Sequence, residues 1–103
     1  IRVPTPNVSV VDLTFESLKE TSESEINSLI KKSSLNKLKG VLSYTEEKLV
    51  SMDFNHDPHS SIFAADQTKV LEKKMVRVLS WYDNEWGFSN RMSDTALEMA
   101  SLF

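Results

Sequence analysis

The chain has 103 residues, of which 40% are hydrophobic and 26% charged, and its 12 basic and 15 acidic residues give a net charge of -3. This composition is ordinary for a globular domain and argues against a disordered or collagen-like chain. No basic excess points to nucleic-acid binding, and no apolar run is long enough to span a membrane. The absence of cysteine excludes disulfides, cysteine-ligated metals and a cysteine nucleophile within these residues.

The first residues predict an extended segment that leads into a strand. Pro4 and Pro6 each bias the residue before them toward extended backbone. Between Val8 and Glu16, apolar and polar residues alternate, which indicates a strand with one solvated face. The chain begins with Ile, so we expect a piece of a longer protein. Its first residues show no charged region followed by an apolar one, so we expect that they are not a signal peptide.

A capping pattern predicts the first helix. Ser22 and Glu25 have the spacing of a capping box, and the apolar residues that follow at helical spacing are Ile26, Leu29 and Ile30. We therefore expect a helix from about Glu23 to Ser34, and Gly40 is a suitable residue for the loop after it.

Several short strands follow. The region from Gly40 to Asp53 predicts two strands around a turn at Tyr44–Lys48, and Ser61–Ala64 predicts a brief strand. The segments Lys69–Leu71 and Met75–Tyr82 predict a hairpin, because the second is rich in β-branched and aromatic residues.

The last segment predicts a helix whose apolar stripe, made of Phe88, Met92, Ala96 and Met99, indicates core packing. The predicted order is strand, helix, several strands and helix. This order predicts an α+β fold in which helices cover one face of a mixed or antiparallel sheet.

The run His56-Asp57-Pro58-His59, together with Asp53, contains residue types that bind zinc or act as a general base. However, Pro58 prevents a regular helix, and the spacing matches no metal motif. A hydrogen-bonded surface turn is the favoured interpretation, and we predict no metal site.

The segment Trp81–Phe88 is the main candidate for a binding site, because it gathers aromatic and polar residues at a strand-to-helix junction. Asn84 offers both a donor and an acceptor, which suits a carboxamide partner. The alternative is that the aromatic residues fix the helix to the sheet and Asn84 only caps it. Arg2 could bind a phosphate through two hydrogen bonds, although an exposed arginine with no ligand is the default.

Four stretches of the chain resemble signatures of glyceraldehyde-3-phosphate dehydrogenases. They are Arg2 to Leu13 (RVPTPNVSVVDL), Leu38-Lys39-Gly40 with Tyr44-Thr45-Glu46, Asp53-Phe54-Asn55, and Trp81 to Gly87 (WYDNEWG). The resemblance covers residues 1–103 in order and identifies them as the C-terminal part of the catalytic domain. It implies that the nucleotide-binding domain and the catalytic Cys and His lie upstream, so no catalytic residue is expected here.

In this family, a cysteine thiolate attacks an aldehyde, hydride passes to NAD, and inorganic phosphate releases an acyl phosphate. The resemblance therefore implies a phosphorylated aldehyde substrate, inorganic phosphate, NAD with NADP not excluded, a cytoplasmic homotetramer, and no nucleic-acid or membrane partner. By position, Arg2 matches the arginine that binds the substrate phosphate, and Asn84 matches the asparagine that orients the nicotinamide. Phe88 stands where many members have tyrosine beside the nicotinamide, so it keeps the ring contact but loses the hydroxyl.

Two alternatives stay open. Erythrose-4-phosphate dehydrogenase is a sister family with the same fold and chemistry, and residues 55–60 and 84–88 resemble it as well. A non-catalytic module kept for oligomerisation or partner binding is the other alternative, and the absence of cysteine would favour it if the chain were complete.

Overall fold

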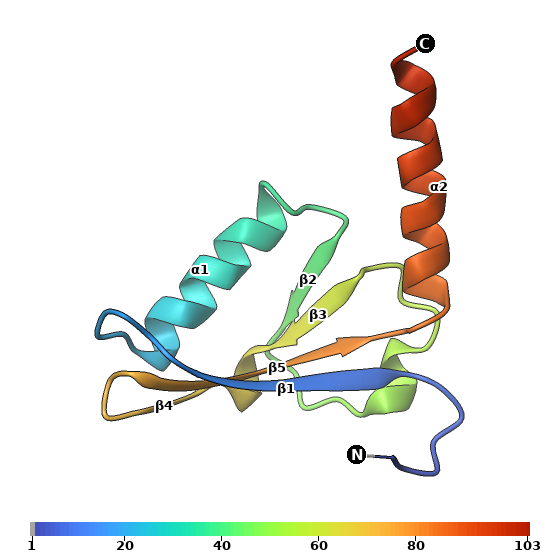
Figure 1. Ribbon diagram of the computed structural model, residues 1–103. Helices are drawn as coiled ribbons and strands as arrows, with labels where there is room; N and C mark the ends of the chain where they lie inside the picture. Colours follow the sequence, from blue (N-terminus) through green and yellow to red (C-terminus); the bar gives the residue numbers. More distant parts are fainter. Residues whose placement is uncertain (1) are drawn as a thin grey trace.

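The structure is a computed structural model that describes residues 2–103, so Ile1 of the predicted lead-in lies outside the described residues. Figure 1 shows a twisted sheet, one helix lying alongside it and a second helix leaving it. The elements in chain order are β1 (Ser9–Glu16), α1 (Glu23–Leu35), β2 (Leu42–Thr45), the 3₁₀ turn η1 (Ser51–Phe54), β3 (Ser61–Ala64), the 3₁₀ turn η2 (Ala65–Gln67), β4 (Lys69–Leu71), β5 (Met75–Tyr82) and α2 (Trp86–Ser101).

The strand β5 organises the sheet, whose order is β1-β5-β3-β2, with β4 also paired to β5. The pairs of β5 with β1, β3 and β4 are antiparallel, whereas β2 and β3 are parallel. The register aligns Ser9 with Tyr82 and Glu16 with Met75, so β1 accompanies β5 over its whole length. The mixed sheet and the α+β class are therefore confirmed.

Most local predictions are confirmed, including the hairpin and the first helix. The Ser22 hydroxyl accepts a hydrogen bond from the Glu25 N–H at 3.2 Å, as a helix cap does. The Glu25 carboxylate, in contrast, accepts from the Thr21 hydroxyl. Gly40 has a φ of 81°, a left-handed conformation that suits glycine after a helix.

The prediction of two strands between Gly40 and Asp53 is wrong in its second strand. Only β2 forms, and the chain then turns into η1, where Asp53 accepts a hydrogen bond from the Val50 N–H at 2.8 Å. The turn lets Phe54 leave the plane of the sheet and become buried, with 3% of its surface exposed. The chain thus places the aromatic ring of Phe54 in the core through the turn η1 rather than through a second strand.

Apolar packing occurs on two sides of the sheet. On one side, Phe54 packs with Val8 and Ile62, and the partly buried residues against them are Leu49 and Trp81. On the other side, α1 lies against β2, and the rings of Tyr44 and Phe63 are stacked. Ile62 and Phe63 of β3 thus pack on opposite sides of the sheet, and β3 pairs with the end of β5.

The second helix does not cover the sheet, and α2 extends from the end of β5 away from the other elements (Figure 1). Met92 and Met99 are 59% and 56% exposed, so the prediction that their stripe packs in the core is wrong for this chain. The apolar face of β1 is also uncovered, since Leu13 and Phe15 are 49% and 41% exposed. Within residues 2–103, neither helix has the length and apolarity needed to cross a membrane.

Candidate functional site

The junction between β5 and α2 is built around one buried carboxylate. Asp83 follows directly after β5 and has only 1% of its surface exposed. Its Oδ1 accepts hydrogen bonds from the backbone N–H groups of Glu85 at 3.0 Å and Trp86 at 2.9 Å. Because helix N-termini have unpaired N–H groups, Asp83 is the side chain that caps α2.

The second oxygen of the same carboxylate binds two other segments. The Oδ2 atom of Asp83 accepts from Nδ2 of Asn7 and from the backbone N–H of His56, both at 2.9 Å. Burial by itself would raise the pKa of Asp83, but the N–H groups of Trp86, His56 and Glu85 and the amide of Asn7 lower it below its ordinary value. The group is therefore a buried anion held by four donors.

Two residues at this network have left-handed backbone. Val8, which follows Asn7, has a φ of 74°, and His56, whose N–H reaches Asp83, has a φ of 63°. A positive φ is costly for a β-branched residue such as valine, at about 1–3 kcal/mol. The strain persists because Val8 is buried in the core and the hydrogen bonds to Asp83 hold both neighbouring segments.

Asn84 and Phe88 lie next to this network and point away from the folded core. Both are exposed, with 65% of the Phe88 surface accessible. Among residues 2–103, the Asn84 carboxamide makes no hydrogen bond at this junction. The Glu85 side chain does not cap the helix either. The alternative in which Asn84 caps α2 is therefore wrong, and its donor and acceptor remain available to a ligand.

Arg2 lies in the exposed segment before β1, where the Thr5 N–H donates to the Val3 carbonyl at 2.9 Å. Among residues 2–103, no hydrogen bond joins the Arg2 side chain to Asn84 or Phe88. It does tie the segment that carries Arg2 to the junction, because Asn7 contacts Asp83.

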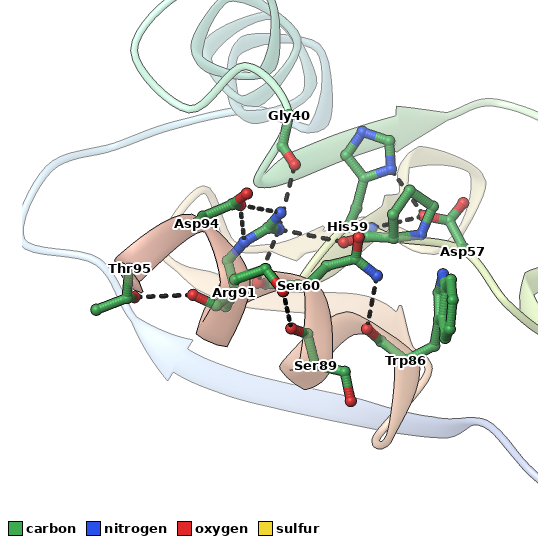
Figure 2. Close-up of polar contacts among 12 residues, drawn as sticks. Gly40, Asp57, His59, Ser60, Trp86, Ser89, Arg91, Asp94 and Thr95 are labelled. Atoms are coloured by element: carbon green, nitrogen blue, oxygen red, sulfur yellow. Dashed lines mark hydrogen bonds and ion pairs between the residues drawn. The ribbon is translucent and has the colours of Figure 1, made fainter. Parts of the chain in front are cut away.

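The first turns of α2 are fixed to the rest of the fold through Arg91. Figure 2 shows this side chain directed from α2 toward Gly40, Ser60 and Asp94. Its Nη1 donates to the carbonyls of Gly40 at 3.2 Å and Pro58 at 3.1 Å, while Nε donates to Asp94 at 2.8 Å. Arg91 therefore sets the angle at which α2, with Phe88, leaves the sheet.

The histidines of the 56–59 turn have structural partners. The His59 Nδ1 lies 2.7 Å from the Asp57 carboxylate, and the His56 ring stacks on Trp86 at a centroid distance of 5.1 Å. Across residues 2–103, no three His, Cys, Asp or Glu side chains gather as a metal site would require. The turn is hydrogen-bonded, as predicted, and it braces the start of α2.

The candidate residues do not enclose a ligand by themselves. A surface hollow of about 420 Å³ lies between α1 and β2, and its lining contains none of Arg2, Asn84 and Phe88. Sequence reasoning missed Asp83 and Arg91. An acidic residue just before a predicted helix could have indicated Asp83 as a cap, but no local pattern indicates its contact with Asn7.

Comparisons with known proteins show which family the sequence is similar to. A family model described as glyceraldehyde 3-phosphate dehydrogenase, C-terminal domain, matches residues 1–84. Proteins named glyceraldehyde-3-phosphate dehydrogenase from Cereibacter sphaeroides and Xanthobacter flavus are 65% and 62% identical over 99% of this chain. A protein of the same name from Zymomonas mobilis is 57% identical over 97% of it. The chain spans only 31%, 30% and 30% of these three relatives, which is about a third of their length.

Proposed function

The chain belongs to the glyceraldehyde 3-phosphate dehydrogenase family, whose C-terminal domain it matches, and we propose that it forms part of a phosphorylating, NAD-dependent enzyme of glycolysis. The proposed reaction oxidises glyceraldehyde 3-phosphate to 1,3-bisphosphoglycerate. Residues 1–103 are the C-terminal portion of the catalytic domain in this proposal, and the nucleophile and base come from other parts of the protein. The chain alone, which has no cysteine, is expected to be inactive.

The availability of the Asn84 carboxamide is the observation that carries the proposal. Asp83 takes over the capping of α2, so Asn84 can offer its donor and acceptor to a nicotinamide carboxamide. Phe88, in the first turn of α2, presents an exposed ring that suits apolar contact with the same group. These residues fit the cofactor, which when bound would accept the hydride, and their own contribution is to hold its ring in one orientation.

Arg2 is proposed to bind the phosphate of the substrate. A guanidinium makes two parallel, charge-assisted hydrogen bonds to a phosphate, and the exposed position of Arg2 leaves it able to do so. Binding the phosphate fixes one end of the substrate, so that the aldehyde end meets the nucleophile and the nicotinamide.

The relatives' names favour glyceraldehyde 3-phosphate over erythrose 4-phosphate, and an enzyme over a non-catalytic module. The proposal includes a homotetramer, supported by the exposed apolar face of β1, which a second subunit could cover. A cytoplasmic location belongs to the same proposal and follows from the glycolytic role rather than from a feature of the structure.

A dehydrogenase assay on a full-length protein that carries this chain tests the proposal. NADH absorbance is followed with phosphate, with NAD or NADP, and with glyceraldehyde 3-phosphate or erythrose 4-phosphate offered in parallel. We expect a preference for NAD and glyceraldehyde 3-phosphate, and a loss of about 100-fold in kcat for Asn84→Ala, because a misoriented ring reacts slowly. No turnover with either aldehyde would contradict the proposed function.

Arg2→Ala and Arg2→Lys separate phosphate binding from folding. Both variants should lower kcat/KM for the phosphorylated aldehyde by roughly 10-fold or more, since a hydrogen bond to a charged group contributes about 1.5–3 kcal/mol. Unphosphorylated glyceraldehyde is the matched control, because its turnover should not change. An equal loss with both aldehydes would contradict the phosphate role of Arg2.

A further inference from the structure

We propose that Asp83 is a positioning residue that fixes the nicotinamide-orienting Asn84 and the Arg2-bearing segment relative to each other. The inference rests on the proposed function, since it concerns how the two ends of that site are aligned. No hydrogen bond joins Arg2 to Asn84 in the described chain, whereas Asp83 bonds to Asn7 on the Arg2 side and to Glu85 and Trp86 on the Asn84 side.

The bonding of the carboxylate supports this role. A carboxylate has about four acceptor positions on two oxygens, and Asp83 receives four N–H donors. The donors to Oδ1 belong to Glu85, just before α2, and to Trp86, its first residue, directly after Asn84. The donors to Oδ2 belong to Asn7, five residues after Arg2, and to His56. Because the carboxylate is planar and rigid, one oxygen cannot move without the other, and a shift of one segment is passed to the other.

Capping the helix does not account for the whole arrangement. A cap needs one side-chain oxygen, and serine or asparagine supplies it as well as aspartate does. Asp83 uses its second oxygen for Asn7 and His56, and it keeps a charge at a position that is 1% exposed. Burying a charge is costly unless several donors compensate it, so the bridge between segments, rather than the cap, explains why a charged group stands here.

The backbone strain next to the bridge supports the same conclusion. Val8 and His56 adopt positive φ angles of 74° and 63°. Val8 follows Asn7, whose side chain donates to Asp83, and the backbone N–H of His56 donates to Asp83 directly. Strained backbone persists where the surrounding contacts over-determine it, and it occurs often where side chains must be held in one geometry.

Substitution of Asp83 by Asn separates the bridge from the cap. The Asn oxygen can still accept from Glu85 and Trp86, but its NH₂ group would then face the donors of Asn7 and His56. Asn7→Ala breaks the bridge from the other side and leaves the Asp83 charge and the cap intact. Thr68→Val is the matched control, because Thr68 is 2% exposed and donates a 2.7 Å hydrogen bond to Asn27, on the α1 side of the sheet.

The experiment uses a full-length protein that carries this chain and measures kcat, KM and amide hydrogen exchange for the wild type and the three variants. We expect Asp83→Asn to lower kcat/KM about 10- to 100-fold, with KM raised for both NAD and the phosphorylated aldehyde. Exchange should become faster at the start of β1, next to Asn7, and in residues 84–88 together. Asn7→Ala should raise KM mainly for the aldehyde, and Thr68→Val should lower the melting temperature without changing either KM.

Two results would overturn the inference. The first is faster exchange confined to residues 84–88 in Asp83→Asn, which would show a cap alone. The second is a loss of kcat/KM in Asp83→Asn that is no larger than the loss in Thr68→Val when both variants are destabilised equally. If Asp83→Asn fails to fold, Asn7→Ala decides, because unchanged exchange at the start of β1 contradicts the bridge. An inactive wild type would refute the proposed function, and hydrogen exchange would still decide whether Asp83 couples the two segments.

Discussion

The side-chain amide of Asn7 donates a hydrogen bond of 2.9 Å to the carboxylate of Asp83, which lies 76 residues later in the chain. This bond joins the segment before the first strand to the junction after the last strand. The register of β1 with β5 makes it possible, since Ser9 pairs with Tyr82 and the residues just outside this pair are brought together. The residues with proposed roles lie on either side of it, Arg2 before Asn7 and Asn84 after Asp83.

Acid should weaken the folded state through Asp83. Its pKa is lowered in the folded protein, so the carboxylate stabilises the fold above its ordinary pKa and loses that contribution as the pH falls through the folded value. The window lies below about pH 4, the ordinary range for aspartate. We expect the melting temperature of the wild type to fall more steeply in this window than that of Asp83→Asn. Thermal melts over a pH series measure the difference.

High salt provides the control for this prediction. Asp12 also has a lowered pKa, because of its hydrogen bond to Arg77, but both side chains are solvent-exposed and salt should screen their ion pair. The difference between the wild type and Asp83→Asn should therefore persist at high salt. Equal slopes for the two proteins would contradict the prediction.

Gly87→Ala should destabilise the start of α2. A Cβ at this position would lie 2.8 Å from the His59 carbonyl oxygen, so the helix or the 56–59 turn must move. Overpacking of this kind costs about 1–3 kcal/mol in the free energy of unfolding, which urea denaturation of the full-length protein measures. Ser89→Ala, on the exposed side of the same helix, is the control and should change little. An unchanged midpoint for Gly87→Ala would show that the turn adjusts freely.

Arg91→Met should loosen the attachment of α2 to the sheet. The change removes the donors to the Gly40 and Pro58 carbonyls, and it keeps the volume of the side-chain stem. We expect a loss of roughly 1–3 kcal/mol in the free energy of unfolding, together with faster hydrogen exchange at the start of α2. Denaturation and exchange measurements on the full-length protein test both.

Arg77→Met is the matched variant. Arg77 also pairs with an aspartate, Asp12, through two nitrogens, but this pair lies on the solvent-exposed surface across strands β5 and β1. Its effect on stability should be smaller than that of Arg91→Met. The reverse order would mean that Arg91 does not fix the helix.

The 103-residue chain on its own should associate in solution. Apolar side chains remain exposed on β1, along α2 and just after it. The exposed fractions are 49% for Leu13, 71% for Leu97 and 104% for Phe103. Exposed apolar residues in such number are normally covered in a stable protein, so we expect oligomers or aggregates in sedimentation velocity. Leu97→Glu and Leu13→Lys together should reduce the association. A monodisperse monomer of the unmodified chain that melts cooperatively would contradict the prediction.

The sequence by itself determined the elements whose causes are local. The capping residues and the apolar spacing located α1, β-branched and aromatic residues located β5, and four signature stretches indicated the family. Each of these signals depends on residues that are neighbours in the chain, so no knowledge of the tertiary structure is needed to interpret it.

Only the tertiary structure decided the features that depend on distant neighbours. The turn η1 replaced a predicted strand because Phe54 packs with Val8 and Ile62, and the stripe of α2 stayed exposed because nothing in the described chain covers it. The hydrogen bond between Asn7 and Asp83 depends on the register that places the start of β1 beside the end of β5. Burial and long-range hydrogen bonding are set by strand pairing across the whole sheet, and local sequence patterns carry no record of them.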